Sequence, residues 1–582
     1  MVTQTGMQEA LPRLGDKADK SGNPLDRVAW QSVVFAPMPK RTELLSLSVS
    51  WPLQALQVRV HRNTPFEFIE GLLKKFLNYA GYDLAVEISD YDDSLSSINQ
   101  IASSGCCPQV EMLWLDYEQY SADMNAEALA EWVGERLREL RTVSTVPILV
   151  PNWPGSHERA CAFNEVFLPL ARSVSGVHVF DIEAIRAELG EAFFDRRLKT
   201  VGATRWSGAA MTLIARSMGL VALPACIRPR LKAIALDLDQ TLYEGVLGED
   251  GPEGVRLTPG YEALQQKCRD FKESGLFLAL VSKNEREDVE ALFQKRRDFP
   301  LRWEDFSAVQ IGWGGKSAAL HQIAADLHIG VDAILFVDDN PGELAQVGTA
   351  IPELPLLHAS DPEVVLRGLE LVPNLAAVSQ TATDLIRVAD MAAERERAAA
   401  RMASVDPQSY LQSLQIRVEL RWNETQERVR IHEIANKTNQ FILSLWRPAE
   451  AEIERFLAQP DAGVVTFYLS DRLSNSGNVG AAFFRREGDD LHVLEVCVSC
   501  RALGRGIEDL VLARAIDLAQ QHLGGNRVVV HHKAGPRNGP GLAWLSSLAE
   551  EALAANGTVT IEWPKADVVS RINAIPAEVV IL

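Results

Sequence analysis

Residues 231–251 read LKAIALDLDQTLYEGVLGEDG, and this stretch decides the fold of the region around it. An apolar run, 234–236, leads into Asp237-Leu238-Asp239, and Thr241 follows two residues later. Because alternate residues of an extended segment point the same way, we expect both carboxylates to face one cleft and Leu238 to face the other side. A buried strand that ends in two such carboxylates is hard to explain by packing and indicates the active-site strand of an enzyme.

Three more apolar strands follow, and each leads into polar residues. The strand 276–281 ends in Ser282-Lys283-Asn284, the strand 308–311 precedes Lys316, and the strand 333–337 ends in Asp338-Asp339. Helical segments between them predict a parallel α/β sheet, and in such sheets ligands bind beyond the carboxyl ends of the strands. We therefore expect all four polar sets to converge on one site.

The number of carboxylates at this site predicts a divalent cation. Two carboxylates about 4 Å apart repel by about 4 kcal/mol at an effective dielectric near 20, so four around one cleft require cations. An oxygen-only ligand set suits Mg²⁺, which keeps water ligands and binds phosphate oxygens of substrates.

The order Asp-x-Asp-x-Thr, Ser, Lys, Asp-Asp, each at a strand end, resembles the haloacid dehalogenase (HAD) superfamily of phosphatases and phosphotransferases. The resemblance implies that Asp237 is a nucleophile that forms an aspartyl-phosphate, and that Asp239 is the general acid and base. It implies that Ser282 and Lys316 contact the phosphoryl group. The implied metal ligands are Asp237, Asp338 and the main-chain carbonyl of Asp239, with Asp339 as a further candidate, and the implied substrate contacts are Thr241, Lys283 and Asn284.

The predicted site has no room for a cap domain between its motifs. Only a glycine-rich turn and one helix separate Asp239 from Ser282, and the stretch from Ser282 to Lys316 is also short. An open site of this kind can accept a group carried on a macromolecule. The alternative is a small-molecule phosphatase with a lid from a neighbouring domain.

A second motif lies in the last part of the chain. The sequence Arg501-Ala502-Leu503-Gly504-Arg505-Gly506 follows the strand 491–498 and precedes a long helix. Such a turn gathers free backbone N–H groups and a helix N-terminus, as pyrophosphate sites do. It resembles the acyl-CoA loop of the GNAT acetyltransferase fold, in which Arg501, Gly504 and Gly506 would hold CoA or the phosphopantetheine arm of an acyl carrier protein. An acyl-CoA-dependent N-acyltransferase is therefore an alternative, with Glu495 or His492 as its base.

Taken together, the segments DLDQTLYEGVLGEDG, SKN, GKS, FVDDNPGE, NKTNQF (436–441) and SCRALGRG (499–506) resemble the FkbH-like family of polyketide and related pathways. The resemblance implies that 1,3-bisphosphoglycerate loses phosphate and that its glyceryl unit is loaded onto an acyl carrier protein thiol. The family stretch usually reads D-x-DNTLWGG, so Gln240, Tyr243 and Glu244 depart from it. Glyceryl loaders are thought to pass the acyl group through a cysteine at the position of Leu238, and the nearest alternative, Cys268, lies in a predicted helix.

The domain boundaries expected from the sequence are a mobile leader (1–40), a flavodoxin- or SGNH-hydrolase-like α/β domain (41–227), a capless HAD-like catalytic domain (228–372), a helical linker (373–406) and a GNAT-like domain (407–582). In the second of these, the first strand is expected at 44–49. That strand lacks the Gly-Asp-Ser turn of a hydrolase, so Ser46, Ser48 and Ser50 are interpreted as structural, and a binding or docking role is favoured.

Composition limits the partners and the location of the 582-residue chain. Its formal charge of −20 argues against nucleic acid as the main partner. Scattered cysteines, the lack of any apolar run that approaches the roughly 20 residues of a membrane helix, and the lack of a secretory signal predict a cytoplasmic protein. Two further alternatives remain: a phosphatase alone, acting on a small or carrier-bound substrate, and a non-catalytic scaffold that docks carrier proteins.

Overall fold

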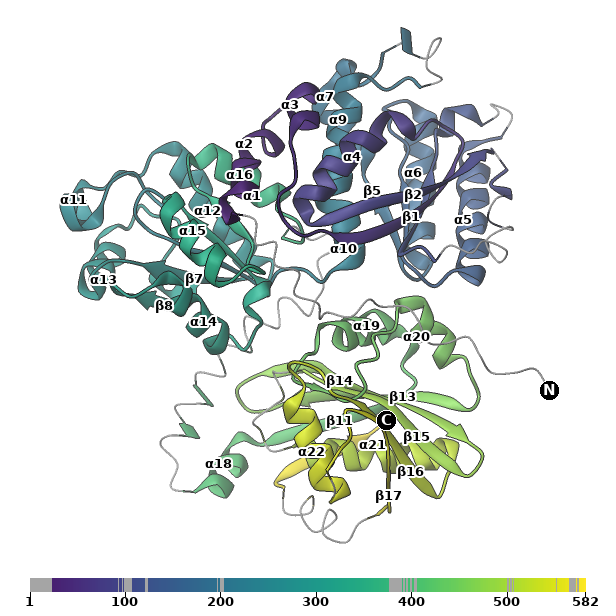
Figure 1. Ribbon diagram of the computed structural model, residues 1–582. Coiled ribbons are helices and arrows are strands. Elements are labelled where there is room, and N and C mark those ends of the chain that lie inside the picture. Colours follow the sequence, from purple (N-terminus) through teal and green to yellow (C-terminus); the bar gives the residue numbers. More distant parts are fainter. Residues whose placement is uncertain are drawn as a thin grey trace.

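In the computed structural model the chain forms three α/β units, each built around its own sheet (Figure 1). The structure describes residues 23–582 except 93, 97, 99–106, 121–123, 196, 199–203, 376–389, 391–392, 394–395, 398–399, 402–405, 500–501, 503–504, 506, 551, 565–571 and 573–574. The first two sheets have five parallel strands each, and the third has eight strands that are mostly antiparallel. The predicted multidomain α/β class is confirmed.

The N-terminal sheet has the strand order β2-β1-β3-β4-β5 and is covered on both faces by helices. Met112 and Trp114 pack toward α4 and α9, while Leu113 between them packs toward α5 and α6, as the alternation of a strand requires. The elements are β1 (Gln54–Arg62), α4 (Glu67–Ala80), β2 (Tyr82–Tyr91), β3 (Val110–Trp114), α5 (Ala126–Val143), β4 (Ile148–Pro151), α6 (Glu158–Ser173), β5 (Val177–Phe180), α7 (Ile182–Leu189) and α9 (Gly208–Ser217).

The first strand of this unit does not lie where the sequence predicted it. The segment expected as a first strand at 44–49 begins inside helix α3 (Arg41–Ser46), because only Leu44 of its apolar residues is buried there and Leu45 is exposed. The first strand is β1, and the turn after it reads Asn63-Thr64, which also lacks Gly, Asp and Ser.

Residues 23–40 were expected to belong to a mobile leader, but the structure packs them as helices. Helices α1 (Pro24–Ala29) and α2 (Gln31–Val34) bury Trp30, Val34 and Phe35, whose apolar surface outweighs the polar and proline-rich composition around them. The Gln31 amide binds the central sheet, donating from Nε2 to the Leu356 carbonyl at 2.7 Å and accepting from the His358 N–H at 3.0 Å. Residues 1–22 lie outside the described part of the chain.

The central sheet has the order β10-β9-β6-β7-β8, so that β6 lies in its middle. Leu236 packs toward α12 and α16, and Ala235 packs toward α14 and α15 on the other face. The elements are β6 (Ala233–Leu236), α11 (Leu247–Gly254), α12 (Pro259–Glu273), β7 (Phe277–Ser282), α13 (Arg286–Lys295), β8 (Phe306–Ile311), α14 (Lys316–Asp326), β9 (Ile334–Asp338), α15 (Pro341–Ala350), β10 (Leu356–His358) and α16 (Pro362–Leu371). The four strands expected here are all present.

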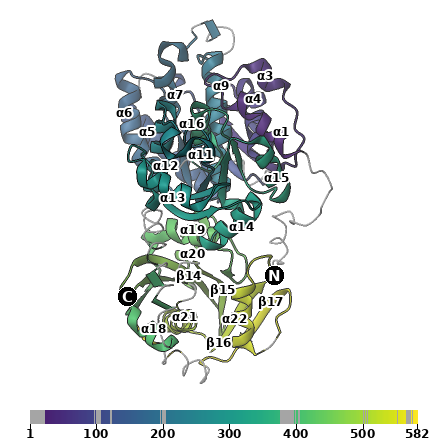
Figure 2. The same ribbon diagram turned by 90° about the vertical axis from the view of Figure 1, so that its left-hand side faces the viewer.

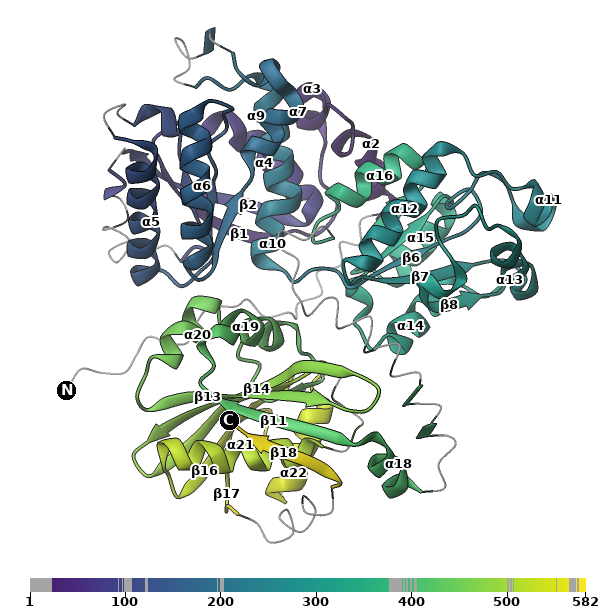
Figure 3. The same ribbon diagram turned by 180° about the vertical axis from the view of Figure 1, so that it is seen from behind.

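The C-terminal sheet has the order β17-β16-β15-β14-β13-β11-β18, with β12 paired to β15 (Figure 3). Helices α19 and α20 cover one face, and α21 and α22 cover the other. The elements are α18 (Pro407–Leu414), β11 (Ile416–Trp422), α19 (Arg428–Lys437), β12 (Phe441–Ile442), α20 (Glu450–Leu457), β13 (Ala462–Ser470), β14 (Asn475–Glu487), β15 (Asp490–Val498), α21 (Glu508–Leu523), β16 (Arg527–Lys533), α22 (Gly539–Ala549), β17 (Asn556–Ile561) and β18 (Ala577–Ile581). Most of the helical linker expected at 373–406 lies outside the described residues.

Among the described residues, one helical run is long and apolar enough, by length and composition, to cross a membrane. It is Gly208–Ile227, which comprises α9, a π-helical turn and α10 (Leu223–Ile227). The sequence reading overlooked this run. In the structure 72% of its apolar 18-residue window is buried inside the protein, and α9 packs against α4, as expected for a core helix.

The N-terminal and central units lie beside each other, and the C-terminal unit contacts both (Figures 1 and 2). Arg455 of α20 donates to the carbonyl oxygens of Arg141 and Thr142 at 2.6 and 3.0 Å. Arg537, before α22, pairs with Asp332 of the central unit at 3.1 Å.

Candidate active site

The carboxyl ends of β6 and β9 bring together the carboxylates that the sequence predicted to converge. The four residues of β6 are fully buried, and the backbone N–H of Asp237 continues the pairing with β9 by donating to the Val337 carbonyl at 3.0 Å. One carboxylate oxygen each from Asp237, Asp338 and Asp339 lies within 4.8 Å of the other two. The site is thus a consequence of two neighbouring parallel strands that end at the same edge.

Lys316 joins two of these carboxylates from the start of α14. Its Nζ lies 2.9 Å from Oδ1 of Asp237 and 2.6 Å from Oδ2 of Asp338. The other oxygen of Asp338 accepts the backbone N–H of Asn340 at 2.9 Å. All three side chains are at least nine-tenths buried, so the ammonium and the two carboxylates form a desolvated ionic cluster.

The electrostatics of this cluster leave it short of positive charge. Burial, with Asp338 as a neighbouring negative charge, raises the pKa of Asp237 to about 7, although Lys316 acts in the opposite direction. Burial also raises the pKa of Asp338, and burial together with Asp338 raises that of Asp339. Burial lowers the pKa of Lys316, but the two carboxylates outweigh this and raise it overall, so Lys316 stays charged.

Asp239 does not join the cluster with its side chain. Its Oδ1 accepts the Tyr243 hydroxyl at 2.7 Å and the Leu247 N–H at 2.9 Å, and its Oδ2 accepts the Asn284 Nδ2 group at 2.9 Å. These donors hold the carboxylate beside the turn that follows β6. For a metal ion this leaves the main-chain carbonyl of Asp239, as the sequence interpretation had it.

The remaining residues predicted to contact substrate lie at the same edge, but they differ in availability. Ser282 is buried and its Oγ accepts from Asn284 at 3.0 Å, so Asn284 links Ser282 to Asp239. Lys283 is turned to α15, where Nζ pairs with Glu343 at 2.5 Å. Thr241 is fully buried, and its Oγ1 has no hydrogen-bond partner in the described part of the chain.

The donor set fits a hard divalent cation. Three carboxylates and one ammonium carry a formal charge of −2 in a largely buried place, and all the candidate ligand atoms are oxygens. Such a set matches the preference of Mg²⁺ for carboxylate ligands, with coordination sites left for water and phosphate. The Thr241 hydroxyl adds one polar group at this edge for which the described residues supply no hydrogen-bond partner.

No cysteine near Asp237 is placed to carry an acyl group, as judged from the described residues. Leu238 is fully buried in the core that underlies β6. Cys268 of α12 is also fully buried, and burial raises its pKa to about 12, so it remains an unreactive thiol. The interpretation of Cys268 as a core residue agrees with this environment.

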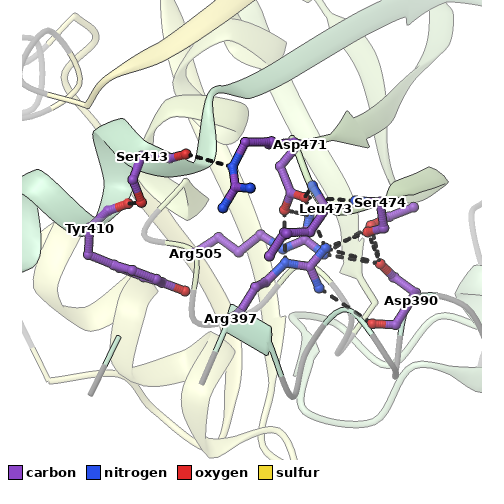
Figure 4. Close-up of polar contacts among 10 residues, drawn as sticks. Asp390, Arg397, Tyr410, Ser413, Asp471, Leu473, Ser474 and Arg505 are labelled. Carbon is purple, nitrogen blue, oxygen red and sulfur yellow. Dashed lines mark hydrogen bonds and ion pairs between the residues drawn. The ribbon is translucent and has the colours of Figure 1, made fainter. Parts of the chain in front are cut away.

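The predicted carrier-arm residues Arg501, Gly504 and Gly506 lie outside the described residues. Arg505 of the same turn is described, and its side chain points inward (Figure 4). Its guanidinium pairs with Asp471 of the β13–β14 turn at 3.1 Å and with Asp390 at 3.4 Å, and Arg397 pairs with the same two carboxylates. Burial raises the pKa of Asp471, but Arg397 and Arg505 lower it overall. The turn is therefore anchored to the segment that joins the central and C-terminal units.

Glu495, a candidate base for an N-acyltransferase, is fully buried and saturated with donors. Its carboxylate accepts the backbone N–H groups of Leu443, Ser444, Trp446 and Val496 and the Ser444 hydroxyl, at 2.7–3.0 Å. The other candidate, His492, has Nδ1 3.0 Å from His531 Nε2 on the neighbouring strand. Glu495 thus anchors the segment that contains β12, and its lone pairs are not free to accept a proton from a substrate.

The sequence matches no family model and no curated protein. Among solved structures, the chain is similar to the N-terminal part of BF1531 from Bacteroides fragilis, which contains a phosphatase domain complexed with Mg, at 19% identity and a TM-score of 0.46, covering 56% of this chain and 96% of that one. It is also similar to mutant forms of the spermidine/spermine N-acetyltransferase SpeG from Vibrio cholerae, at 14% identity and a TM-score of 0.19, covering 25% and 91%. An acetyltransferase of the GNAT family from Streptococcus pneumoniae matches at 16% identity and a TM-score of 0.17, covering 20% and 75%. At these values, none of the three likenesses assigns an activity or a ligand to this chain.

Proposed function

We propose that this protein is an FkbH-like, Mg²⁺-dependent enzyme of the HAD type that removes phosphate from a phosphorylated three-carbon acid and uses an acyl carrier protein thiol as the acyl acceptor. The observation that carries the phosphoryl part is the buried cluster of Asp237, Lys316, Asp338 and Asp339 at one sheet edge. A purely structural ion pair would not need the second and third carboxylates, whose mutual repulsion destabilises the fold.

In this proposal Asp237 attacks the phosphorus of the C3 phosphate ester of 1,3-bisphosphoglycerate, so that a bond forms between its carboxylate and the phosphoryl group while the bond to the C3 oxygen breaks. Asp239 gives a proton to the leaving oxygen and then takes one from the water that hydrolyses the aspartyl-phosphate. Ser282 and Lys316 bind the phosphoryl oxygens. Asp237, Asp338 and Asp339 would hold the Mg²⁺ ion, which would supply positive charge for the phosphoryl group when bound.

The acyl part of the proposal needs no cysteine of this chain. With Leu238 and Cys268 buried, the carrier thiolate itself attacks the carbonyl carbon of the acyl phosphate. A C–S bond forms, the C–O bond to phosphate breaks, and phosphate leaves with the electron pair.

The exposure of Trp313, close in sequence to Lys316, supports a macromolecular acceptor. Trp313 lies three residues before Lys316 and is 70% exposed, while its Nε1 donates to Glu285 at 2.8 Å. The indole is thus held close to the start of α14, which carries Lys316, and tryptophan is common in the centres of protein interfaces.

Two measurements test the proposal. Phosphate release from 1,3-bisphosphoglycerate should require Mg²⁺ and should be abolished by Asp237→Asn. Intact-protein mass spectrometry of the carrier, incubated with the same donor and enzyme, should show the mass of a glyceryl thioester. Phosphate release without any gain of mass on the carrier would instead support the second candidate, a phosphatase alone, which the leucine at position 238 favours.

A further inference from the structure

We propose that Tyr243 is a positioning residue for Asp239, and that its hydroxyl directs the proton of Asp239 to the oxygen that serves the leaving group. This inference rests on the proposed function, because it assumes that Asp239 protonates a leaving oxygen. It goes beyond that function by assigning a role to a residue of the turn that touches no reacting atom.

The turn after β6 is built so that it returns to Asp239. Gln240 has a φ of 55° and Gly245 a φ of 120°, both in the left-handed region, and these two residues close the turn. Gln265 of α12 donates to the Leu242 carbonyl at 2.8 Å, and the Tyr261 hydroxyl donates to the Gln240 carbonyl at 3.1 Å. The turn is therefore fixed to α12 at two points.

The Tyr243 ring is also held in place by its surroundings. It is fully buried and stacks on Phe299 with a centroid distance of 6.0 Å and an interplanar angle of 26°. Burial, with Asp239 alongside, raises the pKa of the phenol well above its ordinary value, so the hydroxyl keeps its proton as a donor. A buried phenol with this restraint is a poor acid itself but a well-placed hydrogen-bond partner.

The partners of Asp239 are distributed unequally between its two oxygens. Oδ1 accepts two donors, Tyr243 and the Leu247 N–H, whereas Oδ2 accepts only Asn284 in the described part of the chain. Because each carboxylate oxygen has about two lone-pair sites, Oδ1 is filled and a proton on Asp239 belongs on Oδ2. Oδ2 is the oxygen on the side of Asn284 and Ser282, where the phosphoryl group is proposed to bind.

Removing the Tyr243 hydroxyl frees a site on Oδ1. In Tyr243→Phe the proton of Asp239 then divides between the two oxygens, and the carboxyl group loses one of three restraints on its rotation. Asp237, Lys316 and the metal-site carboxylates are untouched. Tyr243→Phe should therefore lower kcat/KM only for substrates whose leaving oxygen needs a proton.

The experiment compares two substrates for each protein in Mg²⁺. p-Nitrophenyl phosphate releases a stable phenolate that needs no proton, whereas an alkyl phosphate such as 3-phosphoglycerate releases an alkoxide that does. For Tyr243→Phe we expect kcat/KM for the alkyl phosphate to fall roughly ten- to hundredfold, part of the range that general acid catalysis supplies, with little change for p-nitrophenyl phosphate. Tyr261→Phe is the matched control, because it also removes a hydroxyl bound to this turn but one that does not touch Asp239.

The ratio of the two rates is measured within one preparation, so partial unfolding lowers both rates alike and leaves the ratio unchanged. An equal fall on both substrates, or the same change of ratio in Tyr261→Phe, would overturn the role of Tyr243 while leaving the proposed function intact. If the wild-type protein hydrolyses neither substrate, the proposed function fails and this inference fails with it.

Discussion

The carboxylate Asp339 is expected to destabilise the metal-free protein, and Asp339→Asn should therefore raise its stability. Lys316 lies within ion-pair distance of Asp237 and Asp338, whereas no cation among the described residues lies within 4.0 Å of Asp339. Removing the charge of Asp339 thus relieves repulsion without breaking an ion pair. The same change removes a candidate ligand for Mg²⁺, so the effect should reverse when the ion is present.

The size of the effect follows from the distances. Carboxylate oxygens that lie within 4.8 Å of one another repel by about 3.5 kcal/mol or more per pair at an effective dielectric near 20. Asp339 takes part in two such pairs, but it is partly exposed and water screens its charge. We therefore expect a net gain of about 1–3 kcal/mol in the metal-free protein.

Thermal unfolding in EDTA measures the expected gain in stability of Asp339→Asn, and thermal unfolding in excess Mg²⁺ measures the expected reversal of this effect. The wild-type protein should gain about 2.7 kcal/mol when Mg²⁺ is at 100 times its Kd, and Asp339→Asn should lose much of this gain. Glu353→Gln, which removes an exposed carboxylate of the same unit, controls for net charge. Lys316→Met should have the opposite effect and cost about 3–5 kcal/mol in EDTA, because it leaves the carboxylates unpaired. A loss of stability in EDTA for Asp339→Asn, or an undiminished response to Mg²⁺, would refute this reasoning.

Three further predictions concern charges whose surroundings the structure defines. Because burial raises the folded-state pKa of Asp237 from 3.8 to about 7, the metal-free protein should lose stability as the pH rises through this window, and Asp237→Asn should flatten the dependence in melts from pH 4 to 8. In Glu495→Gln, an amide NH₂ group would face backbone N–H donors that now bind a carboxylate oxygen. The free energy of unfolding in urea should therefore fall by roughly 2–3 kcal/mol, whereas the same change at the exposed Glu487 should cost little. Arg505→Met leaves the buried Asp390 and Asp471 short of one partner and should cost about 3–5 kcal/mol, with faster proteolysis near the Asp390 segment, whereas unchanged cleavage there would contradict the anchoring role.

The sequence was sufficient to place Asp237, Lys316 and Asp338 together because each follows a short apolar strand, and parallel strands end at one edge. It did not place the side chain of Asp239, since its partner Tyr243 returns to it only through a turn with a left-handed Gln240. The Lys283–Glu343 pair joins the residue after β7 to helix α15, and no local pattern indicates it.

The errors in the N-terminal part have a similar origin. The alternation of apolar and polar residues at 44–49 is typical of a strand. The first strand is nevertheless β1, which pairs with β2 and β3, and these neighbours are distant from it in sequence. Likewise, the burial of Trp30 and Phe35 depends on helices that come much later in the chain. Tertiary packing, which a local pattern does not contain, decided these elements.

The contact of Gln31 with β10 has a consequence for how copies of the protein meet one another. β10 is the outer strand of the central sheet, and an outer strand offers unpaired peptide groups to which a strand of another molecule can add. The Gln31 side chain places its own amide against the Leu356 carbonyl and the His358 N–H, as a neighbouring peptide unit would. A single glutamine near the start of the chain thus closes this edge and protects the central sheet from aggregation by strand addition.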